Sequence, residues 1–353
     1  MSSMHAPVVC VIPGDLHLTE PGLDNHRTAR WMIEEVNHLV HPDFVQFIGD
    51  NVQHAEPEQF MLFRDLCDRL QVPWHALVGD HDVHDDDEVH GFRAFVGEPY
   101  GSYSLRGFRF IRLNTLEHRP LGLTQRQIDW FCDEVDQALA AGERVVVFQH
   151  HYPFKVCETF DGPGIDAWRE VVQTRRIAAI FTGHTHYGQI ANDGRNVAVT
   201  TRSIGDPEGG SPGYSIVYLQ GDGLAVTYRA IADEGPIALV IHPRDRLLAT
   251  EPKHIVRGAD RCRVKVWSFQ PVGVVRGCFD EGHWFALERE SASVWSCPLP
   301  GDQLGKGAHT FEVQAIDAAG RACGQEIRFQ VDPTGRYTPV PGVRPPVAST
   351  AFC

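Results

Sequence analysis

The pattern of apolar and polar positions divides the chain into two parts. From residue 8 to about residue 231, short runs rich in Val, Ile and Phe alternate with longer stretches in which apolar residues recur every three to four positions. The short runs predict strands over 8–12, 44–48, 74–78, 108–113, 145–148, 177–181 and 197–201. The periodic stretches predict helices over 25–40, 58–70, 125–140 and 165–174. Alternation of this kind predicts a layered α/β domain with a largely buried sheet.

After residue 232 the helical period disappears. Short strands are predicted over 237–241, 262–269, 283–287, 293–297, 309–317 and 326–332. Closely spaced strands of this kind predict a β-sandwich, and residues 307–320, GAHTFEVQAIDAAG, resemble the last strands of immunoglobulin-like or fibronectin-like modules. The Pro-rich end, with TPVPGVRPPVA, predicts an extended or disordered tail. We therefore expect three parts, 1–231, 232–333 and 334–353.

Charge and cysteine usage exclude several classes of protein. Lys plus Arg number 32 and Asp plus Glu number 46, for a net charge of −14, whereas nucleic-acid binders usually carry a basic excess. No apolar run has the roughly 18 to 20 residues of a spanning helix, and the first residues lack the pattern of a signal peptide. The 9 cysteines form no CxxC pair, which indicates reduced, mostly structural thiols. We expect a cytoplasmic protein with neither a nucleic-acid nor a membrane partner.

Five of the predicted strands end in residue types that bind metal ions. In chain order these are Asp15 and His17; Asp50 and Asn51; Asp80, His81 and Asp82; His150 and His151; and His184 and His186. A single Gly-Asp after a strand is usually only a turn. In open α/β sheets, however, ligands bind outside the carboxyl ends of the strands. Five such ends in succession therefore predict one site rich in Asp and His.

The series GDLH, GDN, GDHD, HH and GHTH resembles the calcineurin-like metallophosphoesterase superfamily, whose motifs read DxH, GD, GNH(D/E), H and GHxH. The resemblance covers roughly residues 8–231. It implies a four-layer fold, in which a β-sandwich is flanked by helices and carries a dinuclear metal centre at its edge. The predicted strands would then divide between two sheets, and residues 1–231 would form the catalytic domain.

The resemblance also implies a ligand set for two divalent ions, with Mn or Fe favoured and Zn as an alternative. One ion would be held by Asp15, His17, Asp50 and His186, and the other by Asp50, Asp80, His184 and either His150 or His151. Counting from the strand end favours His150, whereas the spacing to the following proline favours His151. Two such ions polarise a phosphoryl group and lower the pKa of a bound water, so the bridging hydroxide is the expected nucleophile.

Four further residues are candidates for the chemistry. His81 matches the histidine that meets the phosphate and protonates the leaving oxygen, with Asp82 placed to orient it. Asn51 is expected either to contact substrate or to cap a turn. Arg202 lies in the Gly/Pro/Ser-rich loop TTRSIGDPEGGSPGY (200–214), which is either a solvated connector or a substrate-binding loop, and its guanidinium is the best phosphate-binding candidate there.

Asp80 departs from the family pattern, which has Asn. With two divalent ions, three carboxylates leave a charge of about +1 where two would leave about +2, which favours a monoanionic diester over a dianionic monoester. The sequence therefore predicts a phosphodiesterase for small phosphodiesters of the cyclic nucleotide or glycerophosphodiester type. The alternatives are a phosphomonoesterase or nucleotide phosphatase, and a non-catalytic metal-binding scaffold that would not need His81. The C-terminal module could also mediate a homo-oligomer.

Overall fold

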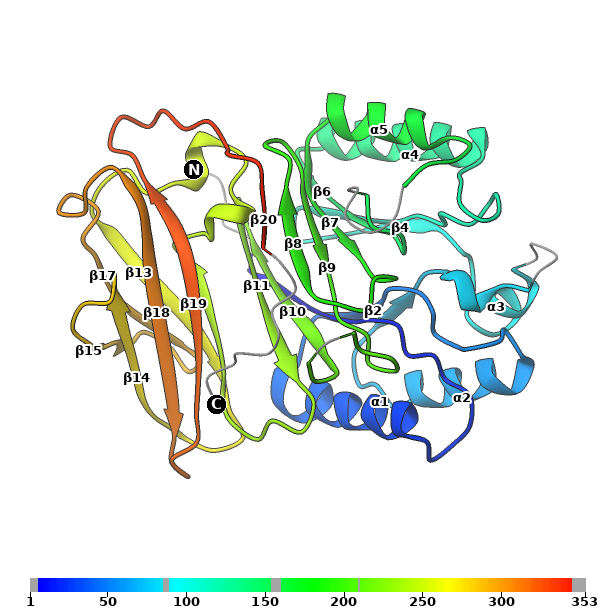
Figure 1. The fold of residues 1–353 in the computed structure, drawn as a ribbon, viewed down its shortest axis with the longest axis horizontal. Coiled ribbons are helices and arrows are strands. Elements are labelled where there is room, and N and C mark those ends of the chain that lie inside the picture. Colours follow the sequence, from blue (N-terminus) through cyan, green and yellow to red (C-terminus); the bar gives the residue numbers. More distant parts are fainter. Residues whose placement is uncertain (1–5, 85–88, 154–159, 209, 345–353) are drawn as a thin grey trace.

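Two β-sandwiches lie side by side, and the first carries helices on both outer faces (Figure 1). The computed structural model describes residues 6–84, 89–153, 160–208 and 210–344. The first sheet has the order β11 (Gly223–Ala230), β10 (Gly213–Gln220), β1 (Val8–Pro13), β2 (Phe44–Phe47) and β3 (Trp74–Ala76). The second has the order β20 (Gly342–Arg344), β8 (Gln189–Asn192), β9 (Val197–Thr200), β7 (Ile177–Thr182), β6 (Arg144–Phe148), β5 (Phe108–Arg112) and β4 (Gly101–Leu105).

The central strands of both sheets run parallel. β1, β2 and β3 are parallel to one another, as are β5, β6, β7 and β9, while the outer strands pair antiparallel. Alternate residues of β1 face opposite sides: Cys10 belongs to the core between the sheets, and Val11 to the core beneath the helices. Both faces of the sheet are therefore buried, as the continuous apolar runs predicted.

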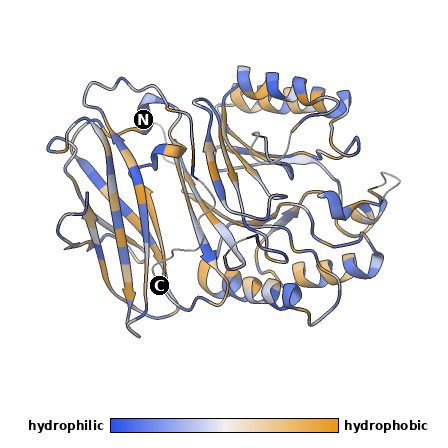
Figure 2. Ribbon diagram, in the orientation of Figure 1, coloured by the Kyte–Doolittle hydropathy of each residue, from blue (hydrophilic) through white to orange (hydrophobic). Residues whose placement is uncertain are grey.

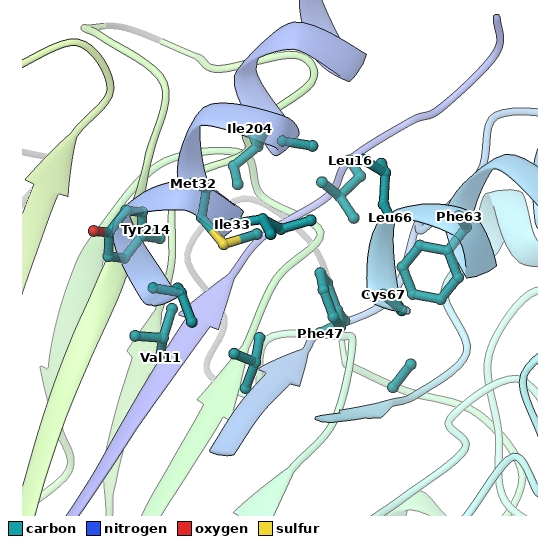
Figure 3. Close-up of a cluster of buried hydrophobic side chains, with 14 of the residues drawn as sticks. Val11, Leu16, Met32, Ile33, Phe47, Phe63, Leu66, Cys67, Ile204 and Tyr214 are labelled. Atoms are coloured by element: carbon teal, nitrogen blue, oxygen red, sulfur yellow. The ribbon is translucent and has the colours of Figure 1, made fainter. Parts of the chain in front are cut away.

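Helices cover the outer face of each sheet of the first sandwich. The first sheet packs against α1 (Asp24–Glu35), which continues as a π-helical turn over Val36–Val40, and against α2 (Pro57–Cys67) and α3 (His90–Phe95). The second packs against α4 (Gln125–Ala140) and α5 (Ile165–Thr174). Figure 3 shows part of the first of these cores, with Met32 of α1, Phe63 of α2 and Phe47 of β2. The predicted four-layer arrangement is confirmed.

Local sequence accounts for the limits of these helices. The Thr124 side chain accepts a hydrogen bond from the backbone N–H of Gln127 and so caps α4, and Gly142 beyond its end has a φ of +74°. Pro57 occupies the first position of α2. The apolar stripes of these helices face the sheets, and their polar faces point outwards (Figure 2). In the described part of the chain, no helix combines the length and apolarity needed to cross a membrane.

The second sandwich is built from antiparallel strands alone. One sheet contains β12 (Ile237–His242), β13 (Asp260–Trp267), β17 (Val294–Leu299) and β16 (Glu288–Arg289), and the other β15 (Phe285–Ala286), β14 (Val272–Phe279), β18 (Gly307–Asp317) and β19 (Ala322–Val331). Single 3₁₀ turns lie at Arg246–Leu248 and Pro252–His254. A separate apolar core fills this sandwich, and we propose on that ground that 232–333 is a module of its own. Its immunoglobulin-like character stays a prediction.

The tail returns to the first sandwich. The described part of the predicted tail ends in β20, which pairs antiparallel with β8 and so extends the second sheet by one strand. Residues 345–353 lie outside the described part of the chain.

A buried ion pair also ties the first sandwich to the segment that leads to the second. The Arg229 guanidinium of β11 donates from Nη2 to Glu35 Oε1 of α1 at 2.5 Å and from Nη1 to the carbonyl oxygen of Gly235 at 3.1 Å. The Tyr214 hydroxyl donates to the other Glu35 oxygen at 2.7 Å. Arg229 and Glu35 are both buried, so neither charge can be compensated by bulk water.

Candidate metal centre

The carboxyl ends of β1, β2, β3, β6 and β7 lead into five loops that meet at one edge of the first sandwich. The backbone turns sharply in these loops. Positive φ values occur at Asp15 (32°), His17 (46°), Asp50 (50°), His184 (66°) and His186 (57°). Non-glycine residues rarely adopt this conformation, and strain of this kind clusters at functional sites.

Glycines in these loops allow the close approach of the site residues. A Cβ on Gly49, whose φ is +97°, would lie 2.4 Å from His150 Nδ1. A Cβ on Gly79 would lie 2.3 Å from Asp50 Oδ1. Both contacts are shorter than real Cβ atoms make, so each Gly-Asp motif needs its glycine to bring the loops together.

Four residues could hold a first metal ion: Asp15, His17, Asp50 and His186 each offer a ligand atom, and these atoms lie within 4.8 Å of one another. The Nε2 atoms of His17 and His186 face each other at 3.0 Å. His17 Nε2 also lies 3.8 Å from Asp50 Oδ2.

A second group of four shares Asp50 with the first and adds Asp80, His150 and His184. His150 Nε2 lies 3.3 Å from Asp50 Oδ2 and 3.4 Å from Asp80 Oδ2, and His184 Nδ1 lies 2.8 Å from that Asp80 oxygen. Asp50 therefore lies between the two groups, where one carboxylate can serve two ions.

The chemistry of these side chains fits metal ions. The carbonyl oxygen of Ile48 accepts a hydrogen bond from His150 Nδ1 at 2.8 Å, which leaves the lone pair of Nε2 directed at the two carboxylates. His150 Nε2 and Asp15 Oδ2 are buried and make no hydrogen bond to the described residues. Buried polar atoms of this kind need a partner, and an ion held by each group would supply one.

Burial and neighbouring charge shift the pKa values of these groups in opposite directions. Burial raises the pKa of Asp15 to about 6 and lowers that of His17 to about 4. Burial also acts to raise the pKa values of Asp50 and Asp80, but the adjacent histidines, His150 first among them, bring both well below the usual range. Asp50 and Asp80 are thus held ionised and His17 neutral, which are the forms that bind metals. Against the effect of its burial, the same carboxylates, Asp50 first, raise the pKa of His150, so a bound ion would have to displace a proton from that ring.

Of the two adjacent histidines, the structure brings His150 into the second group. His151 lies behind Asp80, with its Nε2 3.4 Å from Asp80 Oδ1. Its Nδ1 lies 2.7 Å from the Thr115 hydroxyl. The geometry therefore favours His150, as counting from the strand end did. The His150 side chain turns into the site, whereas His151 packs against the loop after β5.

His81 lies beside the first group, but Asp82 does not orient it. The carbonyl oxygen of Gln53 accepts a hydrogen bond from His81 Nδ1 at 2.9 Å, and the His81 ring meets the His17 ring edge-on at 4.7 Å. The buried Asp82 carboxylate instead accepts hydrogen bonds from the backbone N–H groups of Gly79, Asn51 and Val52. These contacts favour a structural role for Asp82, which stabilises the neighbouring Gly-Asp loop, over the predicted contact with His81. Burial, with Asp50 nearby, raises the Asp82 pKa to about 8.

Two residues predicted to contact substrate make structural contacts. Asn51 is fully buried, and its side-chain amide donates to the carbonyl oxygen of Leu77 and to Asp82, which favours the structural one of its two alternatives. The Arg202 guanidinium lies 5.0 Å from the centre of the Tyr228 ring and donates to the carbonyl oxygen of Ser211 at 3.2 Å. Arg202 is buried in this packing on β11, which is a structural role.

Sequence reasoning missed the residues that support the site. Thr115 follows the strand predicted over 108–113, so the strand-end rule could have identified it. Gln53 holds His81 through its backbone carbonyl, and the sequence cannot predict such a contact because every residue carries this group. Arg119, in the same loop as Thr115, donates from Nη1 to the carbonyl oxygen of Asp80 at 3.4 Å and brings a half-buried cation to the rim of the second group.

Comparison of the chain with known protein families gives a match that agrees with the order and geometry of these candidate ligands. The sequence pattern of the calcineurin-like phosphoesterase family matches residues 10–188. The chain belongs to this family. This membership and the fold of the solved structures confirm the predicted family and fold class.

Individual relatives of this family member are distant. A probable cyclic nucleotide phosphodiesterase of Synechococcus sp. is 27% identical over 162 residues, which cover 43% of this chain and 61% of that protein. A probable glycerophosphodiester phosphodiesterase of Arcobacter nitrofigilis is 24% identical over 198 residues, covering 51% of this chain and 72% of that protein. The chain thus matches less than two thirds of the first relative's length.

Solved structures share the fold of the calcineurin-like part. A dimetal phosphatase from Danio rerio superposes with a TM-score of 0.52 at 12% identity and covers 63% of this chain and 96% of its own. A purple acid phosphatase from yellow lupin gives a TM-score of 0.51 at 16% identity and covers 65% of this chain and 52% of its own. At this identity the likeness concerns the fold alone.

Proposed function

We propose that this calcineurin-like phosphoesterase hydrolyses small phosphodiesters at a dinuclear metal centre. The observation that carries the proposal is the pair of four-residue groups that share Asp50. The two relatives named as probable phosphodiesterases support a diester substrate of the cyclic nucleotide or glycerophosphodiester type.

The protein residues divide the work at this centre. Two divalent ions held by the groups would polarise the phosphoryl oxygens and activate a water molecule for attack. His81 is the proposed acid: its Nδ1 is held by the Gln53 carbonyl, so Nε2 is the atom that transfers a proton to the leaving oxygen. Arg119 carries a guanidinium beside the Asp80 carbonyl and is proposed to bind a phosphoryl oxygen.

Asp80 supports a diester over a monoester. It contributes a third carboxylate to the two groups, so with two divalent ions the ligand set retains about +1 of charge. Compared with a site of about +2, this charge costs a dianionic monoester about twice as much attraction as it costs a monoanionic diester, because the attraction scales with the product of the charges. The third carboxylate therefore shifts the preference towards the diester, and hydrolysis of monoesters is the alternative activity.

The test compares the hydrolysis of a diester and a monoester that have the same leaving group, p-nitrophenol. The protein loaded with Mn²⁺, Fe²⁺ or Zn²⁺ is assayed with bis-(p-nitrophenyl) phosphate and p-nitrophenyl phosphate, and then with cyclic nucleotides and glycerophosphodiesters. The proposal expects the higher kcat/KM for the diester with Mn²⁺ or Fe²⁺, and loss of turnover in Asp50→Asn. A higher kcat/KM for the monoester would refute the proposal and indicate a phosphomonoesterase. Metal binding without turnover of any ester would indicate a non-catalytic scaffold.

Two finer predictions accompany the activity. We propose a cytoplasmic location, which the thiols support: Cys262 and Cys297 are paired across β13 and β17 but form no disulfide. Fractionation of cells would test it. A homo-oligomer formed through the C-terminal sandwich also stays a prediction, and light scattering coupled to size-exclusion chromatography would test it.

A further inference from the structure

A cluster of charged side chains lies where the second sandwich joins the first. Arg144 is the first residue of β6, whose opposite end leads to His150, so the cluster is separated from the metal centre by the length of a strand. The 3₁₀ turns at Arg246–Leu248 and Pro252–His254 lie beside it. The members are Arg144, Arg176, Arg244, Lys253 and His254, with the acids Asp222 and Glu251.

The two acids of this cluster are already shared. Asp222 pairs with Arg144 and, at 2.9 Å, with Lys253. Glu251 lies 3.2 Å from Lys253 and 3.9 Å from Arg176. Four cations thus face two carboxylates, which leaves an excess of two positive charges.

Arg244 contributes one of these two charges and has no carboxylate partner in the described part of the chain. Among the described residues no carboxylate oxygen lies within 4 Å of its guanidinium, and Nη1 donates to the carbonyl oxygen of Leu248 at 3.2 Å. Burial, followed by repulsion from Arg144, lowers the pKa of Arg244 to about 9, against the attraction of Glu251. A half-buried cation with no carboxylate partner is costly, so a further negative charge would stabilise this arrangement.

His254 adds a hydrogen-bond donor to the same place. The backbone N–H groups of Thr250 and Glu251 donate to its Nδ1 at 3.1 and 3.2 Å. Since Nδ1 accepts, the proton of the neutral ring is on Nε2. That atom is buried and makes no hydrogen bond to the described residues. Burial and the charges of Arg244, Arg144 and Lys253 lower the pKa of His254, so the ring stays neutral.

We propose that Arg144, Arg244 and His254 bind a small tetrahedral oxyanion of the phosphate or sulfate class at this junction. Guanidinium groups bind two oxygens of such an anion at once, and the His254 N–H would bind another. The anion would neutralise the excess charge and tie β6 to the segment 244–254. That segment already packs on the first sandwich, where Asn192 donates to the carbonyl oxygens of Leu247 and Ala249.

The experiment measures the thermal midpoint Tm of the metal-loaded full chain in sodium sulfate against sodium chloride of equal ionic strength. At a sulfate concentration ten times its dissociation constant, we expect binding to the folded state to raise Tm by about 2 °C. Arg244→Met should weaken sulfate binding by at least about tenfold and abolish the rise. Hydrolysis should be unchanged, because Arg244 is outside the metal centre.

Arg112→Met is the matched control. Arg112 is likewise largely buried and donates to a backbone carbonyl, that of Ala76, but its charged or titratable neighbours are His75 and Tyr103 rather than further arginines. This variant should keep the sulfate response. His254→Phe removes the donor without removing a charge and should lower the response even if Arg244→Met fails to fold.

An equal Tm rise in wild type, Arg244→Met and His254→Phe would overturn the proposal, since it would reduce the effect to general exclusion of sulfate from the surface. Crystals soaked in selenate offer a direct check: anomalous density beside Arg244 and His254 is expected, and its absence at saturating selenate would also overturn the site. Inorganic phosphate and glycerol phosphate, compared in the same assay, distinguish a free oxyanion from the head group of a phosphoester.

Discussion

Replacement of Asp50 should remove both metal ions, whereas replacement of a ligand of one group should remove only one. Asp50 Oδ2 lies 3.8 Å from His17 Nε2 in the first group and 3.3 Å from His150 Nε2 in the second. Asp50→Asn keeps the size of the side chain but removes one charged ligand from each ion. Loss of a residue that merely supports a ligand weakens metal binding about 10- to 100-fold. Loss of the shared ligand should therefore lower the affinity for each ion at least about 100-fold, which corresponds to about 2.7 kcal/mol of binding free energy.

The assay is elemental analysis of protein loaded with Mn²⁺ and then desalted. We expect two ions per chain in wild type, none in Asp50→Asn, and one each in His17→Ala and His150→Ala. His151→Ala is the matched control: it removes the adjacent imidazole, which lies outside the second group, and should retain two ions. One ion retained by Asp50→Asn would refute the shared role, and one ion lost from His151→Ala would refute the assignment of His150.

Three further predictions follow from the same geometry. His81→Ala should retain both metals and lower kcat by about 10²- to 10⁴-fold, with a smaller loss for p-nitrophenyl than for alkyl esters; an equal loss for both esters in steady-state assays would exclude an acid role. Asp80→Asn should raise the ratio of monoester to diester kcat/KM by about tenfold, or about 1.4 kcal/mol, and an unchanged ratio at unchanged metal content would remove the charge argument for a diester. Arg229→Met should destabilise the fold by about 3–5 kcal/mol in urea denaturation because it leaves Glu35 buried without its counter-ion, and Glu35→Met in the same chain should recover part of that loss; full stability of the single variant would contradict the buried pair.

The residues that the structure brings together in the two groups could be identified from the sequence because their signal is local. A metal-ligand residue directly after an apolar strand is placed by that strand, and five strands were identified from their apolar runs. The structural contacts of Asp82 and Arg202 could not be predicted because residue type does not say where a side chain points. The positive φ at Asp50 directs that carboxylate into the site, while Asp82 turns back to the amides of the preceding loop.

Elements with polar or interrupted sequences escaped prediction. β10 and β11 form a hairpin whose eight-residue strands contain Tyr, Ser, Thr and Arg among the apolar residues. β8, with the sequence QIAN, is too short to show a period. The packing of Trp267 from the second sandwich into the core beneath α1 and α2 depends on contacts between distant segments, for which a single sequence carries no pattern.

The return of the tail to β8 changes how the two sandwiches can move. The chain crosses between them twice, before β12 and again between β19 and β20. A body attached at one point can swivel freely, whereas a body attached at two points can only rock about the line between them. The second of these connections ends in β20, which covers the edge of β8, and β8 begins three residues after His186. Cleavage of the 333–341 segment would therefore have two effects. It would leave one covalent connection and the packing around Trp267 to hold the second sandwich, and it would expose an unpaired strand edge close to a metal ligand, where another extended chain could add.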